Sequence, residues 1–208
     1  GLDVQLIFFT GGTTAILAVY IAEQIGLGRQ TGAFLAGSVF NTLVYFLPVL
    51  AGTIVDRYGF KRSLLACFSI FTLGYFLIGL AGLPLGQPLV QAVGPRTFMV
   101  IALVVTAIGG SLIKPSIVGT VARTTTKETA SLGYSIYYTV VNIGAFLGPL
   151  VASLVRRSVG VENVFRVSAA VTAAMAVVVL LFYREPPREA GGQVTSAGQA
   201  LRNLLRVL

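Results

Sequence analysis

A short charged turn separates two long apolar segments of this 208-residue chain and reads Gly52-Thr53-Ile54-Val55-Asp56-Arg57-Tyr58-Gly59-Phe60-Lys61-Arg62. Residues 30–55, which overlap its start, and residues 63–95, which follow it, contain no Asp, Glu, Lys or Arg. A helix that crosses the hydrocarbon core of a bilayer needs roughly 20 mainly apolar residues. The turn therefore joins two segments that are each long enough to cross a membrane.

The same pattern recurs along the rest of the chain. Further segments without charged residues cover 4–22, 97–113, 129–155 and 167–183. Only 11% of the residues are charged and the mean hydropathy is +0.87, whereas a soluble domain carries about 25% charged residues. Lipid offers no hydrogen-bond partner to the backbone, so such segments must be helices or strands of a closed barrel. Barrel strands alternate in hydropathy, and runs such as 177–181 do not, which favours helices.

The sequence therefore predicts an all-α membrane protein with spans at about 5–25, 31–54, 63–83, 97–121, 132–155 and 165–183. This six-helix bundle would occupy residues 1–183, with a first helix truncated at its start. The start is not typical of a signal peptide, because it has no basic region and no small-x-small cleavage site. Residues 184–208 would form a cytoplasmic linker and the start of an amphipathic helix, since leucines recur at helical spacing in 201–208.

The net charge of +8 resides mainly in the short connections, as expected for a protein whose partner is the lipid bilayer rather than a nucleic acid. Seven Lys and Arg residues follow the second, fourth and sixth spans, against five after the first, third and fifth. This bias predicts a multi-pass protein of the plasma (cell inner) membrane with both ends in the cytoplasm.

Metal, cofactor and enzyme chemistry is not expected from this composition. The chain has no His and a single Cys, Cys67, so neither a metal cluster nor an internal disulfide is predicted. No nucleophile and base occur in an arrangement that indicates catalysis. Cys67 is interpreted as a packing residue.

Each residue type in the charged turn has a physical use. Gly52 permits close helix approach, Asp56 suits a helix amino terminus or an arginine partner, and Gly59 allows a tight turn. A simpler interpretation is a positive-inside loop with one acid. The spacing resembles the signature loop of the major facilitator superfamily, which follows the second helix. That resemblance implies a cytoplasmic gate, latched against a second half missing from this chain, formed by Gly52, Asp56, Arg57, Gly59, Lys61 and Arg62.

Lys114 is the only ionisable residue deep within a predicted span. It lies nine residues before Arg123, or roughly 13 Å by helical rise, which places it near the midplane. A cation at that depth usually faces the bundle interior, a water-filled cavity or an acidic partner. Pro115 removes a backbone donor, so a kink is expected beside it. The alternative is a span displaced by two turns, with Lys114 reaching the interface.

Four short stretches resemble the proton-dependent oligopeptide transporters, in the order of that family's helices. They are Ala18–Leu27 at the end of helix 1, Tyr45–Pro48 in helix 2, Gly109–Pro115 in helix 4 and Tyr137–Ala145 in helix 5. The resemblance implies that Lys114 faces a central cavity and binds an anionic substrate group or pairs with a carboxylate. Tyr45, Asn142 and Tyr138 would line the same pocket. Packing or interfacial tyrosines and an interhelical hydrogen-bonding Asn remain the alternatives.

The resemblance implies a secondary active transporter that works by alternating access, with proton-coupled symport of peptides or amino-acid-like small molecules as its function. One departure is that the family's first-helix Glu-x-x-Glu-Arg would fall near residues 3–7, which read Asp-Val-Gln-Leu-Ile. A proton-coupling acid would then lie in the other half, or coupling would not use protons. Alternatives are a drug–proton antiporter, whose helix 5 motif partly resembles Gly144–Pro149, and a non-transporting sensor or subunit.

Overall fold

The computed structural model describes residues 17–186, apart from the side chains of Gln24, Val49 and Glu162. The beginning of the predicted first span and the predicted tail helix lie outside these residues. The elements, η marking a π-helix, are η2 (Tyr20–Gln24), α3 (Arg29–Ala33), η3 (Phe34–Phe40), α4 (Asn41–Tyr58), α5 (Phe60–Ala81), α6 (Gln87–Val93), α7 (Pro95–Ser111), α8 (Ile113–Thr124), α9 (Ala130–Val159) and α10 (Val161–Phe182).

Five helical stretches in the described part are long and apolar enough to cross a membrane: Arg29–Pro48, Phe60–Ala81, Pro95–Thr124, Ala130–Val159 and Asn163–Phe182. They overlap the predicted second to sixth spans, so the prediction of an all-helical membrane protein is confirmed at that level. The predicted first span is described only from residue 17, so the count of six remains a prediction.

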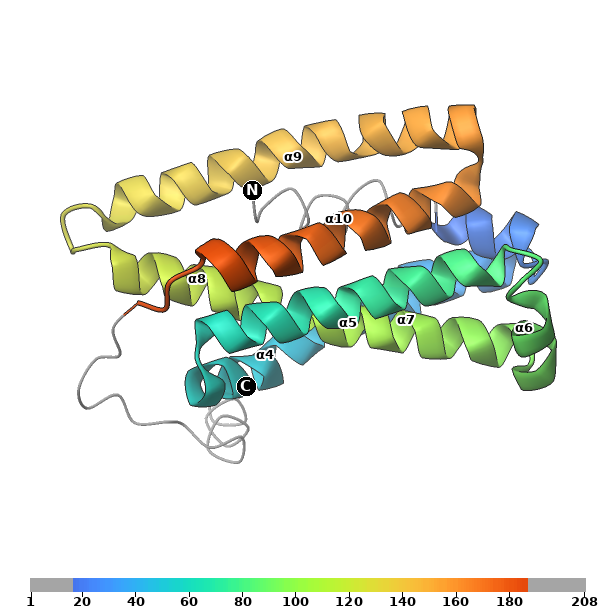
Figure 1. Ribbon diagram of the computed structural model, residues 1–208, viewed down its shortest axis with the longest axis horizontal. Helices are drawn as coiled ribbons and strands as arrows, with labels where there is room; N and C mark the ends of the chain where they lie inside the picture. Colours follow the sequence, from blue (N-terminus) through green and yellow to red (C-terminus); the bar gives the residue numbers. More distant parts are fainter. Residues whose placement is uncertain (1–16, 187–208) are drawn as a thin grey trace.

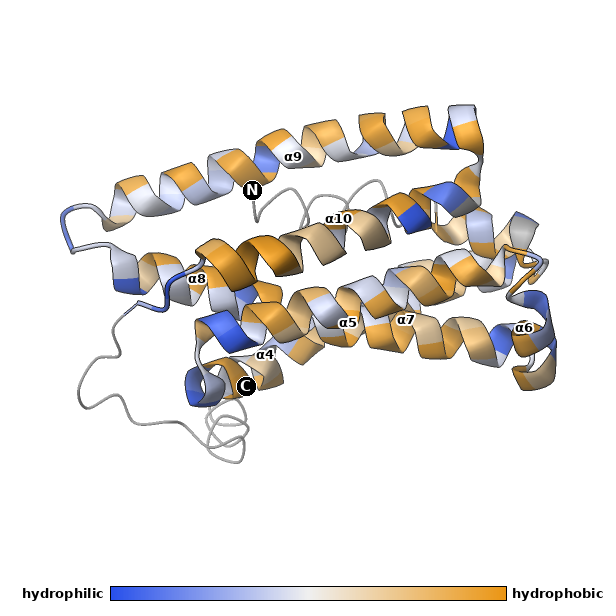
Figure 2. Cartoon of the chain, in the orientation of Figure 1, coloured by the Kyte–Doolittle hydropathy of each residue, from blue (hydrophilic) through white to orange (hydrophobic). Residues whose placement is uncertain are grey.

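The helices run side by side along the long axis of the molecule (Figure 1). Helix α5 lies between α10 and α7, α4 packs against α7 and α8, and α9 contacts α10 and α8. Colouring by hydropathy shows hydrophobic residues along the helices and hydrophilic ones gathered at their ends (Figure 2). This distribution is the one that a bilayer core between two aqueous faces requires.

The core is built around aromatic and aliphatic side chains of the central helices. The largest buried side chains include Phe68 and Phe71 of α5 and Phe165 of α10. Polar groups in this region are paired: the Tyr20 hydroxyl donates to the carbonyl of Ile78 at 2.7 Å, a bond that ties the end of the first span to α5. On the outside, large apolar side chains are exposed, as expected for surfaces that face lipid.

Two features of the chain follow from proline chemistry. The short helix α6 lies between the predicted third and fourth spans, where no helix was expected; Pro88 and Pro95 occupy the first turns of α6 and α7, where no N–H is required. The predicted fourth span is interrupted at Leu112, where α7 ends and α8 begins. The break immediately precedes Lys114 and Pro115.

Candidate functional site

Lys114 stands at the second residue of α8, immediately after the interruption of the span. Pro115 has no N–H to donate to the preceding turn, so the backbone restarts as a new helix there. The residues from Lys114 to Arg123 are all helical, which separates the two cations by about 13 Å along the axis. The hydrocarbon core is about 30 Å thick, so this depth is close to its centre. The Lys114 side chain is exposed on the surface of this bundle.

Tyr45 meets Lys114 from the neighbouring helix α4. The Lys114 ammonium nitrogen lies 5.5 Å from the centroid of the Tyr45 ring, within the range of a cation–π interaction. Tyr45 is 64% exposed, so the ring and the ammonium group form an open site rather than part of the core. Two residues 69 positions apart, which the family resemblance assigned to one pocket, are therefore neighbours.

Asn142 and Tyr138, the other two candidate pocket residues, lie on α9 with exposed side chains. Tyr138 packs edge-on against Tyr137 at 5.0 Å between ring centroids. Within residues 17–186, no hydrogen bond joins either side chain to Lys114. Gly144 and Gly148 are buried on the same helix, as expected for small residues where helices pack closely.

The carboxylates of the described residues lie in connections or near helix ends. Glu23 closes the first span, Asp56 lies near the end of α4, Glu128 is between α8 and α9, and Glu185 follows α10. Among the described residues Lys114 has no ion-pair partner. The site thus offers a cation and an aromatic face without a fixed counter-ion, an arrangement suited to an anionic or zwitterionic ligand.

The gate motif covers the end of α4, the turn at Gly59 and the start of α5. Gly59 has φ of +88°, a conformation that glycine adopts without the steric cost of a Cβ. Asp56 and Arg57 precede it with exposed side chains, and the Arg57 guanidinium lies 5.6 Å from the Tyr58 ring centroid. A methyl group at Gly52 would meet no atom within 4 Å, so in this bundle that face of α4 is open.

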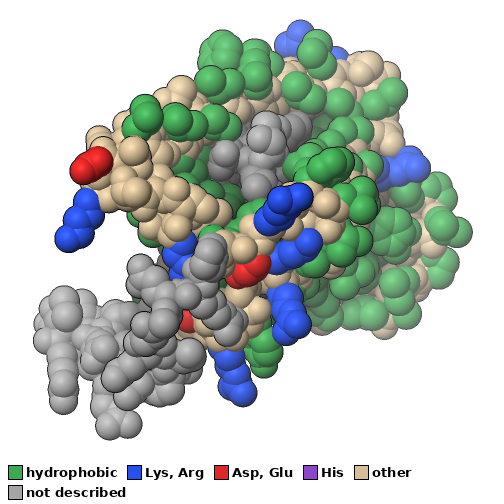
Figure 3. Space-filling model, turned by 60° about the vertical axis from the view of Figure 1, so that its left-hand side comes forward, with side chains coloured by type: hydrophobic (Ala, Val, Ile, Leu, Met, Phe, Trp, Pro, Cys, Tyr) green, Lys and Arg blue, Asp and Glu red, His purple; other side chains and the backbone are tan. Residues whose placement is uncertain are grey.

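The motif lies at one end of the bundle together with the α8–α9 connection and the end of α10 (Figure 1). Figure 3 looks toward this end, where Lys and Arg side chains surround a few acids and hydrophobic side chains cover the flanks. The three connections predicted to share one side of the membrane therefore share one end of the molecule.

Sequence reasoning missed Glu185 at this end. Its carboxylate accepts hydrogen bonds from the backbone N–H of Phe60 at 2.7 Å and of Lys61 at 2.6 Å, the first two residues of α5. Two residues earlier, the Tyr183 hydroxyl is hydrogen-bonded to the Thr120 hydroxyl of α8 at 2.6 Å. Burial raises the pKa of the Tyr183 phenol above its usual range. No local pattern marks Glu185, because its partners are more than 120 residues away.

Comparison with known proteins identifies relatives over most of the chain. The profile of the Major Facilitator Superfamily matches residues 4–208. The chain is 26% identical over 200 residues to dipeptide and tripeptide permease B of Photorhabdus asymbiotica subsp. asymbiotica, covering 95% of this chain and 38% of that protein. It is 26% identical over 166 residues to a di-/tripeptide transporter of Lactococcus lactis subsp. lactis, covering 76% and 31%.

The fold also has a counterpart among solved structures. The crystal structure of the POT family transporter PepTSo superposes with a TM-score of 0.70 at 20% identity, over 91% of this chain and 38% of that one. This likeness shows the fold. The relatives are named as transporters and permeases, which confirms the expectation of a transporter rather than an enzyme. The chain spans less than two fifths of the length of these relatives.

Proposed function

The chain belongs to the Major Facilitator Superfamily, and on that premise we propose that it forms the amino-terminal six-helix half of a secondary transporter for small solutes. Transport would proceed by alternating access, with this bundle rocking against a second one. Peptides or amino-acid-like solutes are the proposed substrates, because the matched relatives are named as dipeptide and tripeptide permeases and transporters.

The observation that carries the proposal is the contact between Lys114 and Tyr45. Removing a cation from water near the centre of a bilayer is costly, so Lys114 must face protein or a water-filled cleft. Its neighbour is the exposed ring of Tyr45 at 5.5 Å, and both side chains are open on one surface of the bundle. In the proposed transporter this surface lines the central cavity, and Lys114 binds the carboxylate of the solute. Asn142 and Tyr138 are proposed to complete the pocket from α9.

We assign residues 1–183 to the bundle and 184–208 to the cytoplasmic linker, with both ends of the chain in the cytoplasm. Gly52, Asp56, Arg57, Gly59, Lys61 and Arg62 would form the cytoplasmic gate. The open space beside Gly52 supports this assignment, because it leaves room for close approach by a helix of the second half. The proposed coupling ion is the proton. Since the described carboxylates lie at helix ends and in connections, we place the protonated acid in the second half.

The test is uptake of a radiolabelled dipeptide by the full-length transporter in proteoliposomes under an imposed proton gradient. Lys114→Ala is expected to abolish uptake while membrane expression stays normal. Lys127→Ala is the matched control, because it removes the same exposed ammonium group from the connection between α8 and α9. Wild-type uptake by Lys114→Ala would exclude this lysine from solute binding.

Two other functions give different results in the same vesicles. A drug–proton antiporter would export a lipophilic cation and leave the dipeptide outside. A non-transporting sensor would be stabilised by the dipeptide and show no counterflow. Either result would overturn the proposed peptide symport.

A further inference from the structure

Helix α5 begins within the gate motif, at Phe60, and has no side-chain cap at its own N-cap residue. Gly59 occupies the N-cap position of α5, and glycine has no side chain that could accept a hydrogen bond from the first-turn N–H groups. The positive φ of the turn favours glycine, so the residue type that allows the turn also leaves α5 uncapped.

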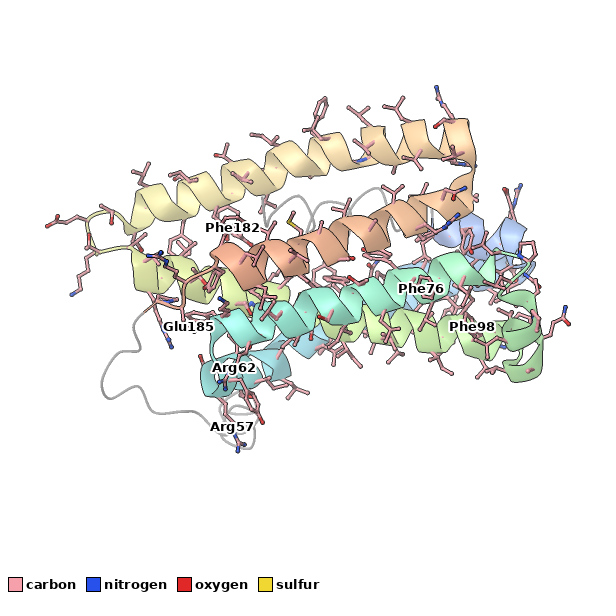
Figure 4. The ribbon with its side chains drawn as sticks, in the orientation of Figure 1. Arg57, Arg62, Phe76, Phe98, Phe182 and Glu185 are labelled. Carbon is pink, nitrogen blue, oxygen red and sulfur yellow. The ribbon has the colours of Figure 1, made fainter. Side chains whose placement is uncertain are left out.

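Glu185 supplies the missing acceptor from the far end of the described chain. One carboxylate oxygen accepts from the Phe60 N–H at 2.7 Å and the other from the Lys61 N–H at 2.6 Å. A negative charge at a helix amino terminus also interacts favourably with the helix dipole. In Figure 4, Glu185 and Arg62 lie at the same end of the bundle. One surface hollow is lined by Tyr58, Gly59, Lys61, Arg62, Glu185 and Pro186.

The surrounding contacts tie the same elements together. The Phe60 ring is 2% exposed, lies against Gly119, and has the Arg123 guanidinium 4.5 Å from its centroid. The Tyr183 hydroxyl bonds to Thr120, one turn before Arg123 on α8. The end of α10, the start of α5 and the end of α8 therefore form one cluster, which we call the cytoplasmic clasp (Phe60, Gly119, Thr120, Arg123, Tyr183 and Glu185).

We propose that Glu185 is a positioning residue of the transporter, which fixes the gate turn to the first residues of the linker between the two halves. This inference rests on the proposed function. A shift of the linker during alternating access would pull on Glu185, and the carboxylate would pass that movement to Phe60 and Lys61 at the base of the gate. Glu185 does not touch the solute, which binds near Lys114 in the middle of the membrane.

A helix cap without a coupling role would affect folding stability alone. A positioning residue also changes how the linker moves and how fast the transporter turns over, with little effect on solute affinity. Both properties can be measured in the full-length protein, using Glu185→Gln and Glu185→Ala. Glu128→Gln is the control, because it neutralises another exposed glutamate at the same end of the bundle. Glu185→Asp retains the charge on a shorter side chain.

The first measurement is the electron paramagnetic resonance line shape of a nitroxide on Arg184→Cys, in a full-length protein whose other cysteines are replaced. We expect an immobilised spectrum in the parent, faster motion in Glu185→Gln and Glu185→Ala, partial restoration in Glu185→Asp, and no change in Glu128→Gln. If the nitroxide moved no faster in Glu185→Ala than in the parent, Glu185 would not fix the linker to the gate turn, and the proposal would be overturned.

The second measurement is dipeptide uptake. Loss of a helix cap typically changes an equilibrium constant by about 2-fold to 30-fold. We expect the maximal uptake rate of Glu185→Ala to be lower than that of the parent by a factor in this range. The KM should stay within about twofold of the parent, since the solute site is remote. A fall in thermal stability with an unchanged maximal rate would reduce Glu185 to a simple cap and overturn the proposal. If the parent carries no dipeptide, the proposed function fails while the spin-label measurement still decides the role of Glu185.

Discussion

A methyl group added at Gly119 is predicted to collide with the aromatic ring at the start of α5. An ideal Cβ at this position would lie 2.5 Å from Cε1 and 2.7 Å from Cζ of Phe60. Carbon atoms in good contact are about 3.5–4.0 Å apart, so the ring must move by about 1 Å. The ring is buried, and the Arg123 guanidinium already occupies a position 4.5 Å from its centroid.

Two opposing effects set the size of the change in stability. Overpacking a filled site costs about 1–3 kcal/mol, whereas replacing a helical glycine by alanine gains about 1 kcal/mol. Gly119→Ala should therefore lower the free energy of unfolding by up to about 2 kcal/mol. In a Phe60→Leu background the atoms that cause the collision are absent. Gly119→Ala should then raise the free energy of unfolding by about 1 kcal/mol.

The assay is a double-mutant cycle on the protein purified in detergent, with unfolding followed by circular dichroism. The predicted coupling energy between the two positions is about 1–3 kcal/mol. The effects of independent substitutions on the free energy of unfolding add to within roughly 0.5 kcal/mol, so a coupling of this size is measurable. If Gly119→Ala had the same effect in both backgrounds, the close contact between Phe60 and α8 would be refuted, and with it the packing of the cytoplasmic clasp.

Two further substitutions test the core between the spans. Gly109→Ala would place a Cβ 2.9 Å from the Phe71 backbone nitrogen and 3.2 Å from the Cys67 carbonyl oxygen, so α5 and α7 must separate. We expect a loss of about 1–3 kcal/mol in unfolding experiments, which Cys67→Ala should not restore because the contacts are with backbone atoms. Tyr20→Phe removes the 2.7 Å hydrogen bond to the Ile78 carbonyl and should cost about 1 kcal/mol, whereas an unchanged melting temperature would contradict that bond.

The positions of the spans could be predicted because charge is excluded from the bilayer core. The predicted spans 63–83 and 132–155 begin and end within four residues of the ends of α5 and α9. Helix α6 was missed because it is too short and too close to prolines to stand out as a span, although the first turn of a helix accepts proline. The first span and the tail helix lie largely outside the described residues and remain predictions.

The candidate site was only partly accessible from sequence. Lys114 was singled out by its depth in a span, but its contact with Tyr45 depends on how α4 packs against α8, which no local pattern encodes. The resemblance to peptide transporters supplied that pairing. Glu185 was assigned to a polar linker, since the helix start that it caps is 124 residues away in the sequence. Contacts of this kind become visible only when the chain is folded.

For this chain to transport a solute as proposed, Lys114 must face a water-filled, solute-binding cleft. The direct measurement is the reaction of Lys114→Cys with a membrane-impermeant thiol reagent, in the full-length transporter with all other cysteines replaced, including the buried Cys67. The predicted result is modification from the aqueous phase that slows in the presence of a dipeptide. A cysteine at position 114 that stays unmodified by the aqueous reagent but reacts with a lipid-soluble one would place this residue against the bilayer and contradict the account.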